Sequence, residues 1–158
     1  MLLFNSPLET GIRSLAILTS LFPKSADLQR LVYMDYLAIH SGDVNGPSSL
    51  HATLPLRSGE LTVRRQLIEQ GLLLVMTRGL VDMNASKEGF LYKASESAAP
   101  FLGLLSTPYI KHLRVRTEWV ADTYGDSTLE ELQALEKTFF SEWTSSFQHL
   151  ESIDNVNL

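Results

Sequence analysis

The spacing of apolar residues in the first eighty positions constrains the fold more than any other feature of this chain. Within residues 8–22, apolar side chains recur every three or four positions, which is the period of an amphipathic helix. Ser6 and Pro7 suit the start of that helix, Glu9 stands where a capping box needs an acid, and Pro23 ends the run. A first helix is therefore predicted here.

Two further stretches show the same helical period. One follows Ser25, the expected N-cap, and ends at His40 before a polar loop. The other follows Ser58, a second candidate cap, and ends at Gly79, a residue type common at helix C-termini. Because the first two helices are joined by a short connection, we expect them to pack as neighbours.

The period changes after Gly79. The stretches LVDM and FLYKAS have the composition of short strands, and the polar sequence NASKEG between them contains Gly89. This pattern predicts a β-hairpin with its turn in NASKEG. Three helices closed by a hairpin is the order of a winged helix-turn-helix domain, in which the hairpin is the wing.

The rest of the chain is predicted to be helical. SESAAPFLGLLS is short and interrupted by Pro100, TPYIKHLRVRTEWVADTYG ends at Gly125, and the last helix begins at the cap sequence DST. The predicted fold class is therefore mainly α. A winged-helix-like domain would occupy residues 1–94, C-terminal helices packed on it 95–150, and a flexible tail 151–158.

Composition excludes several function classes. The chain has 158 residues, 44% of them hydrophobic, which suffices for one core. It has no cysteine, which excludes disulfides, thiolate metal sites and cysteine nucleophiles. The apolar runs fall far short of the ~20 residues that cross a bilayer, and the N-terminus lacks a signal-peptide pattern. We expect a cytoplasmic protein without membrane contact.

The net charge of −5 is unevenly distributed along the chain. From Glu118 onward, nine acidic residues stand against Lys137 alone, whereas the preceding part has a small basic excess. Dedicated nucleic-acid-binding domains usually have a stronger basic excess. The charge balance therefore gives DNA binding little support.

Several short blocks resemble, in the same order, the middle component of bacterial ABC-three-component conflict systems. They are NSPLETGIRSLAIL, FPKSADLQRLVYMDYLAIHSGD, GPSSLHATLPLRSGELTVRRQLIEQGL and YKASESAAPFLGLLSTPY. The likeness covers residues 4–124, and no single motif in it is diagnostic. The group includes the middle subunit of Lamassu-type antiphage defence.

This resemblance implies a small, non-catalytic, winged-helix-like subunit that works with an SMC-like ATPase of the ABC class and a separate effector, often a nuclease. The ATPase would sense foreign DNA, and the middle subunit would couple it to the effector. Contact with the DNA backbone inside the assembled complex belongs to the same expectation. No cofactor is predicted, because the sequence has no Gly-rich phosphate loop.

The polar stretch HSGDVNGPSSLH, residues 40–51, is the candidate for a catalytic or metal site. His40, Asp43 and His51 are conceivable ligands, but the loop offers no fourth ligand and its serines lack the G-x-S-x-G context of a nucleophile. The favoured interpretation is a connection in which His40 ends the second helix as a cation and glycines turn the chain. A hydrolase is the last-ranked alternative.

The third helix and the wing supply the predicted DNA or partner contacts. These residues are Arg57, Arg64, Arg65, Lys87 and Lys93. In a winged helix the third helix reads base edges, while surrounding basic residues touch phosphates. Glu60 and Glu69 on the same helix offer the two neighbouring arginines partners at helical spacing, so ordinary surface ion pairs are the alternative.

A second candidate surface lies on the last helix. Its apolar stripe carries Phe139, Trp143 and Phe147, and Phe140 lies off that stripe, so the helix has more apolar surface than one face needs. Trp and Phe are favoured at protein interfaces. Phe140, Trp143 and Phe147 are therefore predicted to dock a partner, with packing against the domain as the alternative.

Two functional hypotheses rank above the hydrolase. The first is an accessory subunit without enzymatic activity that connects an ATPase to an effector. The second is a stand-alone winged-helix transcription regulator, which would bind duplex DNA tightly and sequence-specifically as a dimer.

Overall fold

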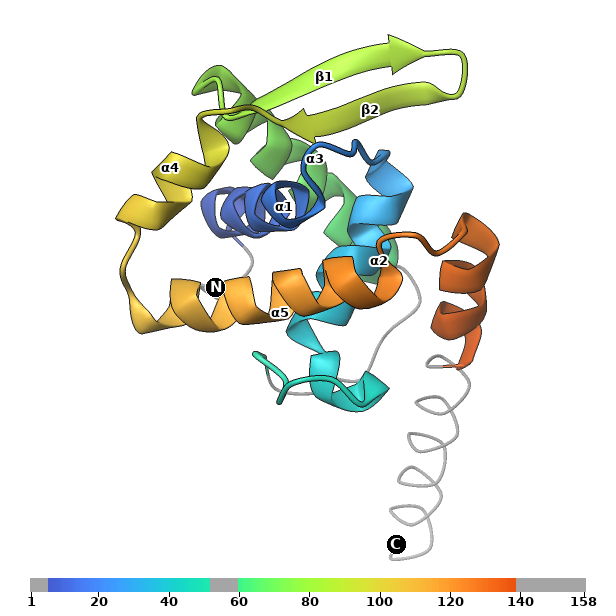
Figure 1. The fold of residues 1–158 in the computed structure, drawn as a ribbon. Coiled ribbons are helices and arrows are strands. Elements are labelled where there is room, and N and C mark those ends of the chain that lie inside the picture. The colour runs from blue at the N-terminus through green and yellow to red at the C-terminus, as the bar shows by residue number, and fades with distance from the viewer. Residues whose placement is uncertain (1–5, 52–59, 139–158) are drawn as a thin grey trace, which may run out of the picture.

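A computed structural model describes residues 6–51 and 60–138 of the chain (Figure 1). The elements are α1 (Pro7–Leu21), α2 (Leu28–Ile39), a short 3-10 helix η2 (Ser41–Val44), α3 (Glu60–Thr77), β1 (Val81–Ser86), β2 (Gly89–Ala94), α4 (Ala98–Leu104) and α5 (Pro108–Tyr124). Residues 129–138 are also helical. This part of the chain is mainly helical with a hairpin after the third helix, which confirms the predicted winged-helix-like fold class.

Local capping residues fix where the helices begin. The Ser6 hydroxyl accepts a hydrogen bond from the Glu9 N–H at 3.2 Å, with Pro7 in the first helical position, as the sequence predicted. The Thr107 hydroxyl caps α5 in the same way. Pro100 does not interrupt α4, because it lies in the first turn, where an N–H has no partner within the helix.

The predicted N-cap of α2 was wrong. Asp27, and not Ser25, accepts a hydrogen bond from the Arg30 N–H at 2.8 Å. The residue before it, Ala26, forms an isolated antiparallel bridge with Tyr92, in which each N–H donates to the other carbonyl at 2.8 Å. Because Ala26 is held in extended backbone at the hairpin, α2 begins later than the caps alone suggested.

The hairpin is longer and its turn tighter than predicted. β1 and β2 pair antiparallel from Val81 opposite Ala94 to Ser86 opposite Gly89, so Lys87 and Glu88 alone form the turn. The base of the hairpin is buried against the helices, whereas its outer half projects from the body of the molecule (Figure 1). It is therefore a wing that is attached at one end.

One hydrophobic core connects the helices on both sides of the hairpin. α1 lies in the middle, and α2, α3 and α5 pack around it (Figure 1). The buried residues of this core that follow the hairpin are Ala98, Leu102, Ile110, Leu113, Val120 and Leu132. Among the described residues, no helix combines the length and apolar character that crossing a bilayer requires.

α1 and α3 cross at a pair of glycines. A Cβ on Gly71 would lie 2.5 Å from the backbone nitrogen of Gly11, and a Cβ on Gly11 would lie 2.6 Å from the carbonyl oxygen of Gly71. Glycine inside a helix costs about 1 kcal/mol relative to alanine. The close approach of the two backbones explains why both helices contain one.

We expect Gly71→Ala to destabilise the fold by about 1–3 kcal/mol, because the added methyl group forces α1 and α3 apart. Gly103→Ala in α4 is the matched control, since nothing lies within 4 Å of the position of its Cβ. The control should be neutral or stabilising by up to about 1 kcal/mol. Urea unfolding followed by circular dichroism measures both; equal effects would contradict the close crossing.

Candidate interaction surface

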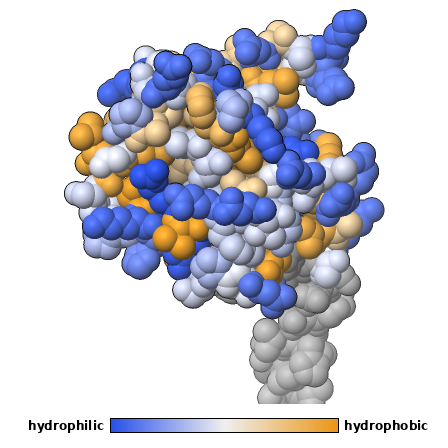
Figure 2. All heavy atoms as spheres, in the orientation of Figure 1, coloured by the Kyte–Doolittle hydropathy of each residue, from blue (hydrophilic) through white to orange (hydrophobic). Residues whose placement is uncertain are grey.

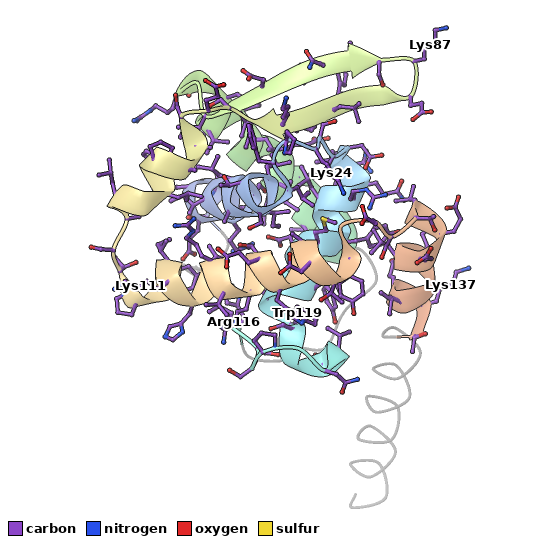
Figure 3. The ribbon with its side chains drawn as sticks, viewed as in Figure 1. Lys24, Lys87, Lys111, Arg116, Trp119 and Lys137 are labelled. Carbon is purple, nitrogen blue, oxygen red and sulfur yellow. The ribbon has the colours of Figure 1, made fainter. Side chains whose placement is uncertain are left out.

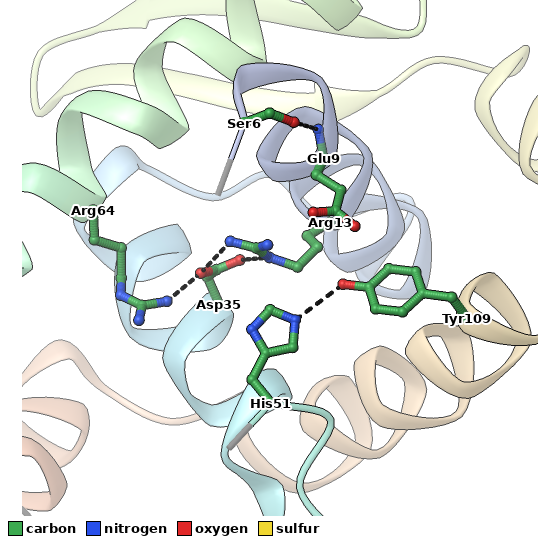
Figure 4. A network of polar contacts seen from close by, with 7 residues as sticks. All are labelled: Ser6, Glu9, Arg13, Asp35, His51, Arg64 and Tyr109. Atoms are coloured by element: carbon green, nitrogen blue, oxygen red, sulfur yellow. Dashed lines mark hydrogen bonds and ion pairs between the residues drawn. The ribbon is translucent and has the colours of Figure 1, made fainter. Parts of the chain in front are cut away.

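The buried carboxylate of Asp35 joins three helices. Arg13 of α1 donates from Nε to Oδ1 at 2.9 Å and from Nη2 to Oδ2 at 3.3 Å, and Arg64 of α3 donates from Nη1 to Oδ2 at 2.6 Å (Figure 4). The side chains of Asp35, Arg13 and Arg64 are 0%, 2% and 10% exposed. We call these three residues the ion triad.

The triad keeps its charges despite its burial. Burial alone would raise the pKa of Asp35, but the two guanidinium groups outweigh it and hold that pKa below its ordinary value. Burial likewise opposes the charge of Arg13, yet the Asp35 carboxylate holds the pKa of Arg13 above its ordinary value. The two arginines therefore compensate the burial of Asp35, and Asp35 in turn compensates the burial of Arg13.

The triad determines what Arg64 can do. This residue was predicted to contact DNA or a partner, with a glutamate on its own helix as the ordinary alternative. In the structure its guanidinium is bound to Asp35 and lies 5.6 Å from the ring centroid of Tyr36. Arg64 is thus part of the interior and is not presented on the surface of α3.

The other predicted contact residues are dispersed. Arg65 is exposed on α3, and Lys87 lies at the tip of the wing, far from Lys111 and Lys137 (Figure 3). Lys93 is half-buried, with its ammonium 5.7 Å from the ring centroid of Phe22. Arg57, Phe140, Trp143 and Phe147 lie outside the described residues. Of the described predicted residues, Arg64 alone takes part in an ion pair within the described part of the chain.

The histidines of the 40–51 stretch face the triad and are neutral. Burial first, and then the positive charge of Arg64, lower the pKa of His40 to about 4. Burial and the charge of Arg13 lower the pKa of His51 to about 4, and His51 Nε2 lies 3.2 Å from the Tyr109 hydroxyl (Figure 4). His40 does end α2, but the expectation that it does so as a cation was wrong, because the site excludes a further positive charge.

The same stretch is docked on α5. Arg116 donates from Nε to the Ser48 carbonyl at 2.8 Å and from Nη2 to the Ser48 hydroxyl at 3.1 Å. Gly46 packs so closely on Trp119 that a Cβ there would lie 2.5 Å from the indole ring. These contacts support the interpretation of residues 40–51 as a structural connection.

No metal centre is assembled in the part of the chain that the structure describes. There, no group of three or more His, Cys, Asp or Glu side chains comes together in a way that could hold an ion. Asp43, the third residue of the hydrolase hypothesis, is exposed on η2. The geometry gives His40, Asp43 and His51 no shared site.

One part of the outward surface of α3 is uncharged, although Arg65 and Glu69 are also exposed on this helix. Exposed residues at helical spacing on α3 form what we call the α3 outer face: Val63, Gln66, Gln70, Leu73 and Leu74. On the wing, Met83 and Phe90 are 42% and 56% exposed. Arg65 and Glu69 lie near Tyr92 of the wing. Burial raises the pKa of Tyr92, Glu69 raises it further, and Arg65 lowers it. The surface where α3 meets the wing therefore combines apolar side chains with one acidic and one basic residue.

Comparison with known proteins identifies the family. A family model described as the ABC-three component (ABC-3C) system Middle Component 2 matches residues 3–146. The chain belongs to this family. The match confirms the expected ABC-three-component middle-component family, without its Lamassu-type grouping, and extends beyond the 4–124 region of the sequence likeness. No curated protein matches this ABC-3C middle component. No solved structure matches it either.

Sequence reasoning missed the triad of this ABC-3C middle component, although one signal was present. Asp35 stands between Met34 and Tyr36 in the middle of an apolar helix. A charged residue is almost never fully buried without a partner, so its position indicated an ion pair. Its partners lie 22 and 29 residues away on other helices, and no local spacing rule could name them.

The two neutral histidines predict a pH dependence. Their pKa of about 4 lies below the unperturbed value of about 6.5, so the unfolded chain binds more protons in that interval and stability falls as pH drops from about 6.5 to about 4. Each histidine contributes at most about 1.4 kcal/mol per pH unit. The Asp35 contribution is lost only at lower pH, below its ordinary pKa.

We expect His51→Gln, which keeps a polar group near Tyr109, to flatten this slope by up to one proton. The measurement is the urea unfolding free energy at a series of pH values from about 7 to about 4, which spans the interval in which His51 takes up its proton in the unfolded chain. His112→Gln is the matched control, because His112 is exposed on α5. A slope that His51→Gln leaves unchanged would contradict a neutral, half-buried His51.

Proposed function

We propose that this middle component is a non-catalytic adaptor that acts in the cytoplasm. It docks on an SMC-like ABC ATPase that senses foreign DNA and links it to a nuclease-type effector, in a defence system of the Lamassu type. Membership in a three-component family implies partner subunits. The identities of the ATPase and the effector, and the coupling role, are part of the proposal.

The observation that carries the proposal is the chemistry of the α3 outer face. In a DNA-reading winged helix, this is the surface that enters the major groove and presents Arg, Asn or Gln to base edges. Here Val63, Leu73 and Leu74 offer no hydrogen bond to a base edge, and the two glutamines of the face are the only members that could. Exposed leucines next to uncharged amides suit a protein interface better than a phosphate backbone.

The transcription-regulator alternative loses its principal residue. Arg64 is held inside by Asp35, so Arg65 on α3 and Lys87 at the wing tip remain exposed, together with Arg78 directly after α3. These residues could still reach a phosphate when a partner brings DNA to this surface. Such contact would be weak and sequence-blind, because it rests on few charges.

A second docking surface completes the proposal. Phe140, Trp143 and Phe147 of the last helix remain proposed partner contacts on the grounds of their residue types. Separately from them, Leu104 at the end of α4 is 81% exposed, and Figure 2 shows apolar surface on the α4 side of the molecule. An adaptor needs two separate contact regions, one for each neighbour.

Co-purification from cells that express the chain with the neighbouring genes of its system tests the adaptor function. We expect Leu73→Asp and Leu74→Asp to weaken capture of the ATPase about tenfold or more, since a carboxylate must be desolvated at the interface. Arg65→Glu and Lys87→Glu are the matched surface controls and should retain capture.

The opposite pattern would support the regulator. In that case the isolated chain binds one duplex sequence tightly, and Arg65→Glu abolishes this binding while both leucine variants retain it. Arg64→Glu is unsuitable for this comparison, because a second carboxylate against Asp35 would destabilise the interior.

A further inference from the structure

The wing has an open strand edge. Among the described residues, β1 pairs with β2 alone, and all of its residues from Asp82 to Ser86 are exposed. β1 is the outermost element at the top of the molecule (Figure 1). An edge strand of this kind is usually protected by a lysine, a proline or a bulge. β1 has none of these.

The hydrogen bonds of Tyr92 show which groups point outward from β1. Tyr92 uses both its N–H and its C=O on Ala26, on the far side from β1, so the pair Met83–Tyr92 is not hydrogen-bonded. Hydrogen-bonded and non-hydrogen-bonded pairs alternate along an antiparallel ladder. The N–H and C=O groups of Met83 and Ala85 therefore point away from the sheet, whereas those of Asn84 point toward β2.

The same residues line an apolar face. Residues directly opposite each other in a ladder share a face, and Met83 is opposite Tyr92 while Ala85 is opposite Phe90. Met83 and Phe90 remain 42% and 56% exposed because Ala26 extends the sheet only at its base. The outer half of the wing is a two-stranded ribbon, which is marginally stable without a third strand or a helix against it.

The charges on the other face define the partner further. Asp82 is opposite Lys93, but the Lys93 ammonium lies at the Phe22 ring, and Asp82 takes part in no ion pair among the described residues. β1 carries no basic side chain. A strand that placed a lysine or arginine beside Asp82 would complement this charge.

We propose that β1 accepts an extended segment of a partner subunit as an added antiparallel strand of the wing. This inference rests on the proposed adaptor function. The segment has apolar residues opposite Met83 and Ala85, so that they cover the face of Phe90, and a basic residue beside Asp82. Its main-chain groups bond to Met83 and Ala85, as in strand-addition recognition.

Two other occupants fit the surface less well. The apolar face of the wing offers no basic side chain to a DNA phosphate: it consists of Val81, Met83, Ala85, Phe90, Tyr92 and Ala94. A second copy of this chain that paired its β1 with this β1 would bring another Asp82 and no lysine or arginine to neutralise it. Charge complementarity therefore favours a partner strand with a basic residue.

Residue-resolved hydrogen exchange tests the proposal on the full chain, alone and in the complex co-expressed with the ATPase and effector genes of its system. The amides of Met83 and Ala85 should exchange freely in the isolated chain and about tenfold or more slower in the complex. The amide of Asn84, already bonded to β2, is the internal control and should change little.

A matched pair of variants provides the second readout. Ala85→Pro removes the outward N–H at a position that β2 does not use, whereas Ala85→Ser keeps it. We expect Ala85→Pro to lose capture of the partner about tenfold and Ala85→Ser to retain it, with circular dichroism verifying that both fold. If Ala85→Pro unfolds, hydrogen exchange of Met83 and Ala85 in the wild-type chain still tests the strand addition.

The outcomes separate the two proposals. A complex that assembles with unchanged exchange at Met83 and Ala85 overturns the strand addition and leaves the adaptor function standing. Protection of these amides by duplex DNA alone, or by raising the concentration of the isolated chain, also overturns it. If the wild-type chain captures neither subunit, the strand addition falls together with the adaptor function.

Discussion

The rest of the structure depends on one buried carboxylate. Asp35 receives Arg13 from α1 and Arg64 from α3, so a single residue of α2 sets how the three helices of the winged-helix-like core are oriented. Removing Asp35 would leave two buried guanidinium groups without a counter-charge, which costs about 3–5 kcal/mol, whereas removing Arg64 leaves the Arg13–Asp35 pair in place. Burial first, and then the positive charge of Arg13, keep the pKa of His51 low, so that it is neutral beside α5. The triad therefore joins the three helices and also acts on the 40–51 connection that packs beside it.

Sequence predicted what local chemistry decides. Ser6 and Pro7 start α1, Gly125 follows α5, and the change of period after Gly79 marks the hairpin. It failed where a distant contact overrides a local preference. Because Ala26 is bridged to Tyr92, the N-cap of α2 is Asp27 and not Ser25. The Gly11–Gly71 crossing could not be inferred from either helix alone. The site residues divided in the same way, because Arg64 faces inward for a reason that lies 29 residues away.

The division of charged and apolar groups is what favours an adaptor. A winged helix that reads DNA keeps its arginines on the surface of the third helix. This ABC-3C middle component places one of them inside and leaves leucines, amides and an open strand edge outside. Main-chain groups and apolar faces recognise protein segments. In the proposed adaptor function, a buried aspartate redirects one arginine and leaves this surface to a protein partner.

The most direct measurement compares the unfolding free energies of Arg64→Ala and Arg65→Ala. The two residues are adjacent arginines, but only Arg64 is bound to Asp35. The account predicts a loss of about 1.5–3 kcal/mol for Arg64→Ala, because one charge-assisted hydrogen bond to Asp35 is lost, and a change within about 0.5 kcal/mol for Arg65→Ala. Equal, small losses for both variants would show that Arg64 is a surface residue and would contradict the account.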